Sequence, residues 1–380
     1  MGAKIYLDYA AATPIDDEVL ALMRPYFAEL FYNPSADYLA AREIKKQLNT
    51  ARAKIAYWLG VQANEIIFTA GGTEANNLAI NGFMSNYPSA KILTSPVEHD
   101  SVLIPTRKYN HQEIPVRPDG RLDLMHLETA IDDSTAMVSV MYANNEIGTI
   151  QPLHKIAAIV ERARQDRKAR GIKLPLVLHT DACQAANYLD LHTSRLGVDL
   201  MTLNGGKLYG PKQSGALYVK RGIVLVPQIQ GGGQEFNLRS GTENVAQAIG
   251  LAASLDKAQS IRPAESARLI SLRNHFIERL EKELKAGING SKSYRLPNNV
   301  HSTFAGIDNE YLLIGLDRQG IMAAAGSACS ASKEESSHVL HALGLSDEAS
   351  RSSIRFSLGR QTTLKDIDHT LEVLGRLIKH

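Results

Sequence analysis

A lysine and an aspartate each follow an apolar run in the middle of the chain. The apolar run 200–203 ends at small residues that present Lys207, and the run 174–180 is followed directly by Asp181. A lysine amine condenses with an aldehyde, and a carboxylate can keep a pyridine nitrogen protonated so that the ring accepts electrons. The pair therefore indicates the chemistry of pyridoxal 5'-phosphate (PLP). A surface lysine beside a turn and a helix-capping aspartate would explain either residue taken singly.

The segment 69–77, Thr-Ala-Gly-Gly-Thr-Glu-Ala-Asn-Asn, offers a site for the phosphate of such a cofactor. A predicted strand leads into a turn that Gly71 and Gly72 allow, and Thr73 begins a predicted helix. Free N–H groups at a helix N-terminus, together with a threonine hydroxyl, can bind an anion. The alternative is a plain helix cap with Thr73 at the N-cap position.

Three polar residues at predicted strand ends are placed to contact the cofactor ring. His99 follows the predicted strand 91–94, where its imidazole could stack on the ring and move protons, a cap or packing role being the alternative. Asn145, in an amide-rich loop, could hydrogen-bond a ring substituent, and Gln184 could contact the phenolate oxygen of the ring. Cys183 is predicted to face the other way, as a small buried hydrophobe.

The second cysteine, Cys329, stands in a run of small residues, 323–337, that predicts a flexible and solvent-accessible loop. A thiol in such a loop can act as a nucleophile that approaches a cofactor and then swings away. An incidental cysteine in a serine- and alanine-rich linker is the alternative. Because the sequence also carries the other residues of PLP chemistry, we expect Cys329 to be catalytic.

Arg355, in the strand-like segment 353–357, carries a guanidinium that can bind an amino-acid carboxylate at two points. Arg360 and Arg239 compete for this role. For each of the three arginines, a surface salt bridge is the alternative.

The composition excludes several other classes of function. Hydrophobic residues make up 44% and charged residues 22% of the 380 residues, and the net charge of +2 gives no field to attract nucleic acid or a membrane. We therefore expect a small-molecule substrate, no direct nucleic-acid contact and no membrane association. The first residues lack the apolar core of a signal peptide, and the two cysteines form neither a disulfide framework nor a zinc-ligand pattern. We expect a cytoplasmic protein with free thiols and no metal site.

Between about residues 60 and 220, short apolar runs alternate with helical patterns such as 73–87 and 154–170. This alternation predicts an α/β fold with a mainly parallel sheet flanked by helices. Ligands bind such sheets at the carboxyl ends of the strands, where the candidate site residues fall. The predicted strands are 65–69, 91–94, 136–142, 174–180, 200–203 and 215–219.

The C-terminal part has a different pattern. Helical periodicity dominates from 242 to 285, and strand-like segments then alternate with helices up to a last helix at 364–379. We predict a large PLP-binding domain at 13–252. A smaller α+β domain, formed by 1–12 and 253–380, would carry the cysteine loop. The strand-like segments are 299–304, 321–324 and 353–357.

Taken in order along the chain, the motifs resemble those of the cysteine desulfurases of the NifS/IscS-like group, members of the class V aminotransferase family within the fold-type I PLP enzymes. The resemblance covers almost the whole chain, and the combination of motifs is highly specific. The motifs lie at residues 6–14, 33–35, 73–74, 98–99, 144–148, 181–184, 207–212, 231–234, 239–242, 326–332 and 353–360.

The resemblance implies a PLP-dependent enzyme that takes sulfur from L-cysteine, leaves L-alanine and carries the sulfur as a persulfide on Cys329. Lys207 would bind the cofactor aldehyde, Asp181 would pair with the pyridinium, and His99 would stack on the ring and take part in catalysis. The residues implied to bind PLP are Gly72, Thr73, His99, Asn145, Asp181, Gln184, Asn204, Gly206, Lys207 and Thr242, and those implied to bind the substrate carboxylate are Asn33 and Arg355.

The resemblance also implies partners. The family forms homodimers with active sites near the subunit interface, where Thr242 would reach the phosphate of the neighbouring subunit. The length of the loop around Cys329 is similar to that of the subgroup that hands persulfide directly to an acceptor protein. That acceptor would belong to iron–sulfur cluster assembly, or to a thio-cofactor or tRNA-thiolation pathway.

Three departures from the family pattern stand out. Asn204 replaces the usual serine or threonine three places before the lysine, and Gly206 replaces the usual histidine just before it, so we expect weaker binding of the cofactor. Tyr38 stands where a histidine commonly follows the Asn-Pro-Ser turn. The sequence ends at His380, without the C-terminal extension by which some relatives dock an iron–sulfur scaffold.

Two other functions are consistent with the sequence. One is a different class V PLP enzyme, such as a selenocysteine lyase or an aminotransferase. The other is a non-catalytic relative that binds partners, for which Gly206 is the best argument.

Overall fold

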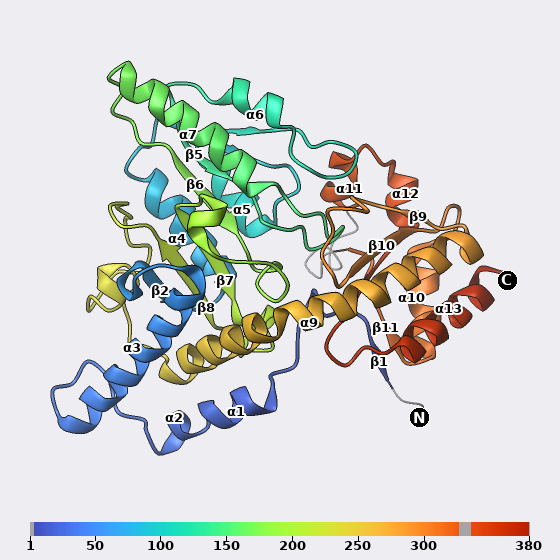
Figure 1. Ribbon diagram of the computed structural model, residues 1–380, viewed down its shortest axis with the longest axis horizontal. Coiled ribbons are helices and arrows are strands. Elements are labelled where there is room, and N and C mark those ends of the chain that lie inside the picture. The colour runs from blue at the N-terminus through green and yellow to red at the C-terminus, as the bar shows by residue number, and fades with distance from the viewer. Residues whose placement is uncertain (1–3, 327–335, 380) are drawn as a thin grey trace.

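The computed structural model describes residues 4–326 and 336–379. A seven-stranded sheet forms the centre of the larger lobe. Its strands are Ile66–Thr69 (β2), Lys91–Thr94 (β3), Asn110–Glu113 (β4), Thr135–Ser139 (β5), Val177–Asp181 (β6), Leu200–Asn204 (β7) and Gly215–Val219 (β8). They lie in the order β2-β8-β7-β6-β5-β3-β4 (Figure 1). The five strands from β7 to β4 run parallel, and β8 runs antiparallel to both β7 and β2. The predicted mainly parallel sheet is confirmed.

Three strands of this sheet differ from the prediction by more than one residue. Strand β4 was not predicted, because its four residues are polar and exposed at the edge of the sheet. Strand β6 begins at Val177 rather than 174, since Pro175 has no N–H to donate to a neighbouring strand. Strand β5 ends at Ser139, although the backbone N–H of Tyr142 still donates to the carbonyl of Asp181 (2.8 Å).

Helices cover both faces of this sheet, because successive residues of each strand point to opposite sides. In β8, Ala216 and Tyr218 join one apolar cluster, and Leu217 and Val219 join the other. One face is covered by α3 (Leu39–Leu59), α7 (Leu153–Ala169) and α9 (Val245–Leu284), and the other by α4 (Gly72–Met84) and α5 (Asp100–Thr106). Shorter helices are α1 (Asp17–Met23), α2 (Pro25–Ala28), α6 (Leu124–Ala130) and α8 (Thr193–Leu196).

A smaller lobe follows α9 in the chain. Its antiparallel sheet has the order β12-β10-β9, formed by Ser353–Ser357 (β12), Asn299–Thr303 (β10) and Gly287–Ile288 (β9). Its helices are α10 (Asn309–Arg318), α11 (His338–Ala342), α12 (Asp347–Arg351) and α13 (Leu364–Ile378). The start of the chain also belongs here, since Ile5–Tyr6 (β1) pairs in parallel with Ile321–Met322 (β11).

The 40-residue helix α9 spans both lobes (Figure 1). It packs against α1 and α3 in the larger lobe and against β10 and α13 in the smaller one. The domain boundary proposed between 252 and 253 falls inside this continuous helix and stays a prediction. Although α9 is long, neither it nor any other helix in the described part of the chain is apolar enough to cross a membrane.

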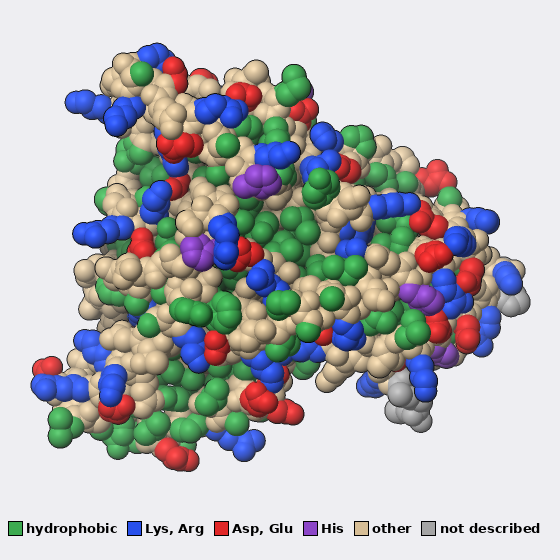
Figure 2. Space-filling model, viewed as in Figure 1, with side chains coloured by type: hydrophobic (Ala, Val, Ile, Leu, Met, Phe, Trp, Pro, Cys, Tyr) green, Lys and Arg blue, Asp and Glu red, His purple; other side chains and the backbone are tan. Residues whose placement is uncertain are grey.

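The surface carries charges of both signs. On the face shown in Figure 2, basic and acidic side chains are interspersed over both lobes. Many charged side chains of the described residues form exposed ion pairs, such as Lys54 with Asp256 (2.9 Å). The mixture agrees with the small net charge of the sequence.

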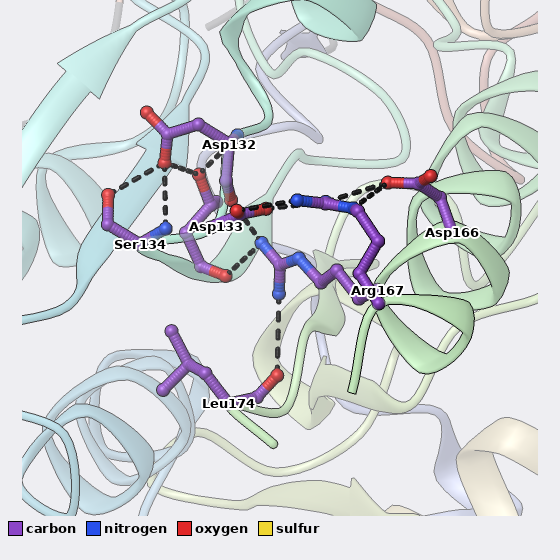
Figure 3. Close-up of polar contacts among 8 residues, drawn as sticks. Asp132, Asp133, Ser134, Asp166, Arg167 and Leu174 are labelled. Atoms are coloured by element: carbon purple, nitrogen blue, oxygen red, sulfur yellow. Dashed lines mark hydrogen bonds and ion pairs between the residues drawn. The ribbon is translucent and has the colours of Figure 1, made fainter. Parts of the chain in front are cut away.

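Arg167 ties the C-terminal half of α7 to the turn before β5 (Figure 3). Its side chain, which is 3% exposed, donates to the carbonyl oxygens of Asp132, Thr135 (2.7 Å) and Leu174 (3.5 Å). One turn along the helix, the exposed Arg170 pairs with the carboxylate of Asp133 through both of its terminal nitrogens. The buried guanidinium thus donates to the buried carbonyl of Thr135 and to the part-buried carbonyls of Asp132 and Leu174.

We expect Arg167→Met to lower the free energy of unfolding by about 2–4 kcal/mol, because it removes a donor from the buried carbonyl of Thr135 and the bonds that tie α7 to the turn before β5. Arg170→Met serves as the control and should cost no more than about 1 kcal/mol, since its ion pair is exposed. Urea unfolding followed by circular dichroism measures both effects. Equal losses in the two variants would contradict the assignment.

Candidate active site at the carboxyl edge of the sheet

A cavity of about 90 Å³ lies at the carboxyl ends of the parallel strands. Its walls come from the ends of β6 and β7, the first turns of α4 and α5, the loop after β5, the start of the chain and β12. The predicted site residues on these walls are Gly72, Thr73, His99, Asn145, Asp181, Gln184, Asn204, Lys207 and Arg355. Gly206 lines an adjoining wider hollow of about 560 Å³, which shares Thr73, Asn204 and Lys207 with the first.

Lys207 ends a single 3-10 turn, Gly205–Lys207, that directly follows β7. The side chain of Asn204 caps this turn, because its oxygen accepts a hydrogen bond from the N–H of Gly206 (3.1 Å). The amine of Lys207 donates to the carbonyl oxygens of Ala10 (2.8 Å) and Ala11 (2.5 Å). The start of the chain therefore fixes the direction of the lysine side chain.

Asp181, the last residue of β6, is only 8% exposed, and both of its carboxylate oxygens are hydrogen-bonded. One accepts from the backbone N–H of Cys183 (2.8 Å), and the other from the side-chain amide of Asn76 (2.7 Å). Sequence reasoning missed Asn76. The available signal was an amide within the otherwise apolar inner face of a predicted helix, beside Ala75 and Ala79.

The proposed phosphate cradle lies at the start of α4. This helix begins at Gly72, and its N-cap is Gly71, whose φ of 140° suits a glycine. The alternative of a plain cap with Thr73 at the N-cap position is wrong, since no side chain caps the helix. Its first N–H groups are therefore available to an anion.

Cys183 lies on the wall of the cavity, so the prediction that it faces away is wrong. The hydrogen bond from its N–H to the Asp181 side chain forms a turn at the strand end, and strand alternation does not extend into that turn. The sulfur lies 2.8 Å from the position that a Cβ on Gly72 would take. Burial, reinforced by the Asp181 carboxylate, raises the pKa of the Cys183 thiol well above its usual value, so the thiol stays protonated.

His99 is both a wall residue of the cavity and the N-cap of α5. Its Nδ1 accepts a hydrogen bond from the backbone N–H of Ser101 (3.1 Å). His99 therefore caps a helix, which was the alternative role that the sequence offered, and it also lies at the site.

The amide-rich loop after β5 is held by Asn144 rather than by Asn145. The side chain of Asn144 is fully buried, donates to the carbonyl of Val97 (2.8 Å), and accepts from the N–H groups of Glu146 and Ile147. This leaves Asn145 on the cavity wall. Across the cavity, Gln184 donates to the carbonyl of Ala10 (3.0 Å).

Arg355 projects from β12 onto the cavity wall and is 1% exposed. It donates to the carboxylate of Asp8 (2.7 Å) and to the carbonyl of Asn145 (3.0 Å). Of its two rivals, Arg360 pairs with Asp16 and stacks on a tyrosine, and Arg239 pairs with Glu74. Neither rival lines this cavity.

Cys329 lies outside the described residues. On one side of it, Ala324 pairs through its backbone with Arg355 (2.7 and 3.2 Å). On the other side, the Ser337 hydroxyl donates to the Glu146 carboxylate (2.6 Å), and His338 Nε2 donates to a backbone carbonyl next to His99 (3.0 Å). The described residues on both sides of Cys329 therefore lie beside the cavity.

Two residues implied by the resemblance do not reach the cavity of this chain. Asn33 is exposed in a turn, where its side chain accepts from the N–H of Ser35 (2.9 Å). Thr242 is exposed just before α9. Their roles stay predictions. Within the described part of the chain, no cluster of His, Cys, Asp and Glu could hold a metal ion.

Residues 5–370 match the family of class-V aminotransferases. The whole chain is 41% identical to the cysteine desulfurase IscS of Dictyoglomus turgidum and covers 95% of that protein. The chain belongs to the class-V aminotransferase family, among its cysteine desulfurases. Enzymes of this family depend on PLP.

Solved structures agree with this assignment. The cysteine desulfurase superimposes on a NifS-like protein with a TM-score of 0.91 and 30% identity, over 99% of this chain and 100% of the other. It also superimposes on SspA, solved in complex with cysteine, with a TM-score of 0.81 and 32% identity, over 94% of this chain and 99% of SspA. The predicted PLP-enzyme fold is therefore confirmed.

Gly72→Ala should destabilise this desulfurase by about 1–3 kcal/mol, because the new Cβ overlaps with the sulfur of Cys183. Adding Cys183→Ala removes the sulfur and should recover most of that loss, which urea unfolding of the single and double variants measures. A double variant no more stable than Gly72→Ala alone would contradict this packing.

Proposed function

We propose that this cysteine desulfurase binds PLP in the cavity at the sheet edge, takes sulfur from L-cysteine and passes it to Cys329, leaving L-alanine. The observation that carries the proposal is the position of Lys207, Asp181 and Arg355 on the walls of one cavity. They offer the amine, the carboxylate and the guanidinium that PLP chemistry on an amino acid needs.

The residues of the cavity fit PLP. The uncapped start of α4 suits the phosphate, and the buried carboxylate of Asp181 suits the protonated ring nitrogen. Gly206 leaves open space beside the phosphate cradle, since a Cβ on this glycine would have no neighbour closer than 3.5 Å. The amide nitrogen of Asn204 is available there as a hydrogen-bond donor to the cofactor. When bound, PLP supplies an aldehyde that links to the substrate amine and a ring that accepts electrons from the α-carbon.

The chain's own residues then bind the substrate and move its protons. The guanidinium of Arg355 would hold the substrate carboxylate at two points. The amine of Lys207, displaced by the substrate amine, would take the proton from the α-carbon. The carbonyl oxygens of Ala10 and Ala11 direct that amine toward the site.

In the sulfur transfer, the thiolate of Cys329 attacks the sulfur of the substrate. A sulfur–sulfur bond forms, the carbon–sulfur bond breaks, and the electron pair stays with the β-carbon, which takes up a proton. Return of the proton held by Lys207 to the α-carbon then gives alanine. The persulfide then remains on Cys329. The anchoring of Ala324 at Arg355 and of Ser337 at Glu146, on either side of this cysteine, supports its access to the cavity.

We further propose that the enzyme works as a cytoplasmic homodimer and passes sulfur to an acceptor protein of iron–sulfur cluster assembly or of a thio-cofactor or tRNA-thiolation pathway. The exposure of Thr242 supports a role toward the phosphate of a neighbouring subunit. The mixed charge of the surface supports a small-molecule substrate rather than nucleic acid.

Incubation with L-cysteine should add one sulfur to Cys329 and none to Cys183, because burial keeps the Cys183 thiol protonated. Mass spectrometry of digested, alkylated protein locates the added sulfur. Cys329→Ala should lose nearly all sulfide release, and Cys183→Ala should keep it. Full turnover by Cys329→Ala would overturn the proposal and favour another PLP activity, such as selenocysteine cleavage.

Arg355→Lys should raise the KM for cysteine by about tenfold or more, because a lysine offers a point charge where the guanidinium offers two parallel donors. Arg360→Lys is the control, since Arg360 pairs with Asp16 away from the cavity. Steady-state alanine production gives both values. A larger effect in the control would assign the carboxylate to Arg360 instead.

A further inference from the structure

A chain of hydrogen bonds joins two residues that the proposed function uses separately. The amide of Asn76 donates to the carboxylate of Asp181 (2.7 Å) and to the hydroxyl oxygen of Ser101 (2.9 Å). That hydroxyl lies 2.9 Å from Nδ1 of His99. Asn76 is 1% exposed and Ser101 is 8% exposed, so solvent does not compete for these bonds. We call these four residues the Asp181–His99 relay.

The direction of each bond follows from its donors. The backbone N–H of Ser101 donates to Nδ1 of His99 (3.1 Å), so this nitrogen is an acceptor and carries no proton. The Ser101 hydroxyl, which contacts the same nitrogen, must then be the donor in that contact, while its oxygen accepts from the Asn76 amide. The neutral ring must then carry its proton on Nε2.

We propose that Asn76 and Ser101 are positioning residues that fix His99 in the Nε2–H tautomer and hold the Asp181 carboxylate in place for the ring nitrogen. This inference rests on the proposed function of the same site. One relay thereby sets the hydrogen bonding of a carboxylate and of an imidazole that line the same cavity.

The tautomer of His99 decides which of two basic groups, His99 or Lys207, can take the proton from the α-carbon of the substrate. With Nδ1 occupied by two donors, the ring nitrogen of His99 left for another partner is Nε2, which carries a proton and can only donate. It has no lone pair with which to take the α-proton. That transfer falls to Lys207, on the wall of the same cavity.

The direct test is the protonation of the two ring nitrogens in the holoenzyme without substrate, measured by NMR with ¹⁵N-labelled histidine. The signal of His99 is assigned by its disappearance in His99→Gln. We expect a protonated Nε2 and an unprotonated Nδ1 at neutral pH. A proton on Nδ1 would overturn the proposal. Because no turnover is needed, this result is independent of whether cysteine is the substrate.

Two variants test whether the relay fixes the tautomer. Asn76→Asp replaces the donor by an acceptor, so the Ser101 proton turns to the new carboxylate and Nδ1 keeps only the backbone donor. Ser101→Ala removes the hydroxyl, and Ser101→Thr retains it. We expect the first two variants to give a mixture of tautomers and to lower kcat about tenfold, within the range for groups that assist proton transfer, while Ser101→Thr stays close to the wild type.

The matched control is Ser95→Ala. Ser95 is also a buried serine and lies just before α5, but its hydroxyl accepts from the N–H of Val97 (3.3 Å) and has no part in the relay. It should keep the wild-type tautomer and kcat. If Ser101→Ala and Asn76→Asp both retain the wild-type tautomer and kcat, the relay does not position His99 and the proposal fails.

Discussion

A carboxylate removed from water must find hydrogen-bond donors, and at Asp181 this requirement organises the site. Its two donors come from different elements, the backbone just after β6 and the Asn76 side chain on α4. The bond to Asn76 ties the helix to the strand end. Since the phosphate cradle proposed for PLP is the first turn of the same helix, the proposed positions for the ring nitrogen and for the phosphate both depend on this one buried group.

The positions of Lys207 and Asp181 were predictable because each follows a strongly apolar strand, and the carboxyl ends of parallel strands meet at one edge. Asn76 and Cys183 were not. Asn76 lies on a face of α4 that the sequence pattern identifies only as buried. Cys183 is turned toward the cavity because its backbone N–H bonds to the Asp181 side chain, and strand periodicity does not predict such a bond. Strand β4 was missed for a related reason, since an exposed edge strand has no apolar run.

The residues known only through the resemblance form a separate group. Asn33 and Thr242 carry no local signal of chemistry, and each lies on the exposed surface of this chain rather than in its cavity. On the proposed homodimer, such residues would meet the site only across the subunit interface, and an argument from the residues of a single cavity does not reach them. Cys329, which sequence reasoning chose for its small neighbours, lies outside the described residues.

The ion pair between Asp8 and Arg355 has a consequence for selectivity. The Asp8 carboxylate already neutralises the guanidinium within the chain, so on the proposed role of Arg355 an incoming amino acid exchanges one anion for another and gains only the difference between them. The acid group of cysteine then adds little net affinity. A thiol that lacks an acid group leaves the ion pair intact, so the guanidinium serves to orient the substrate rather than to select it by affinity.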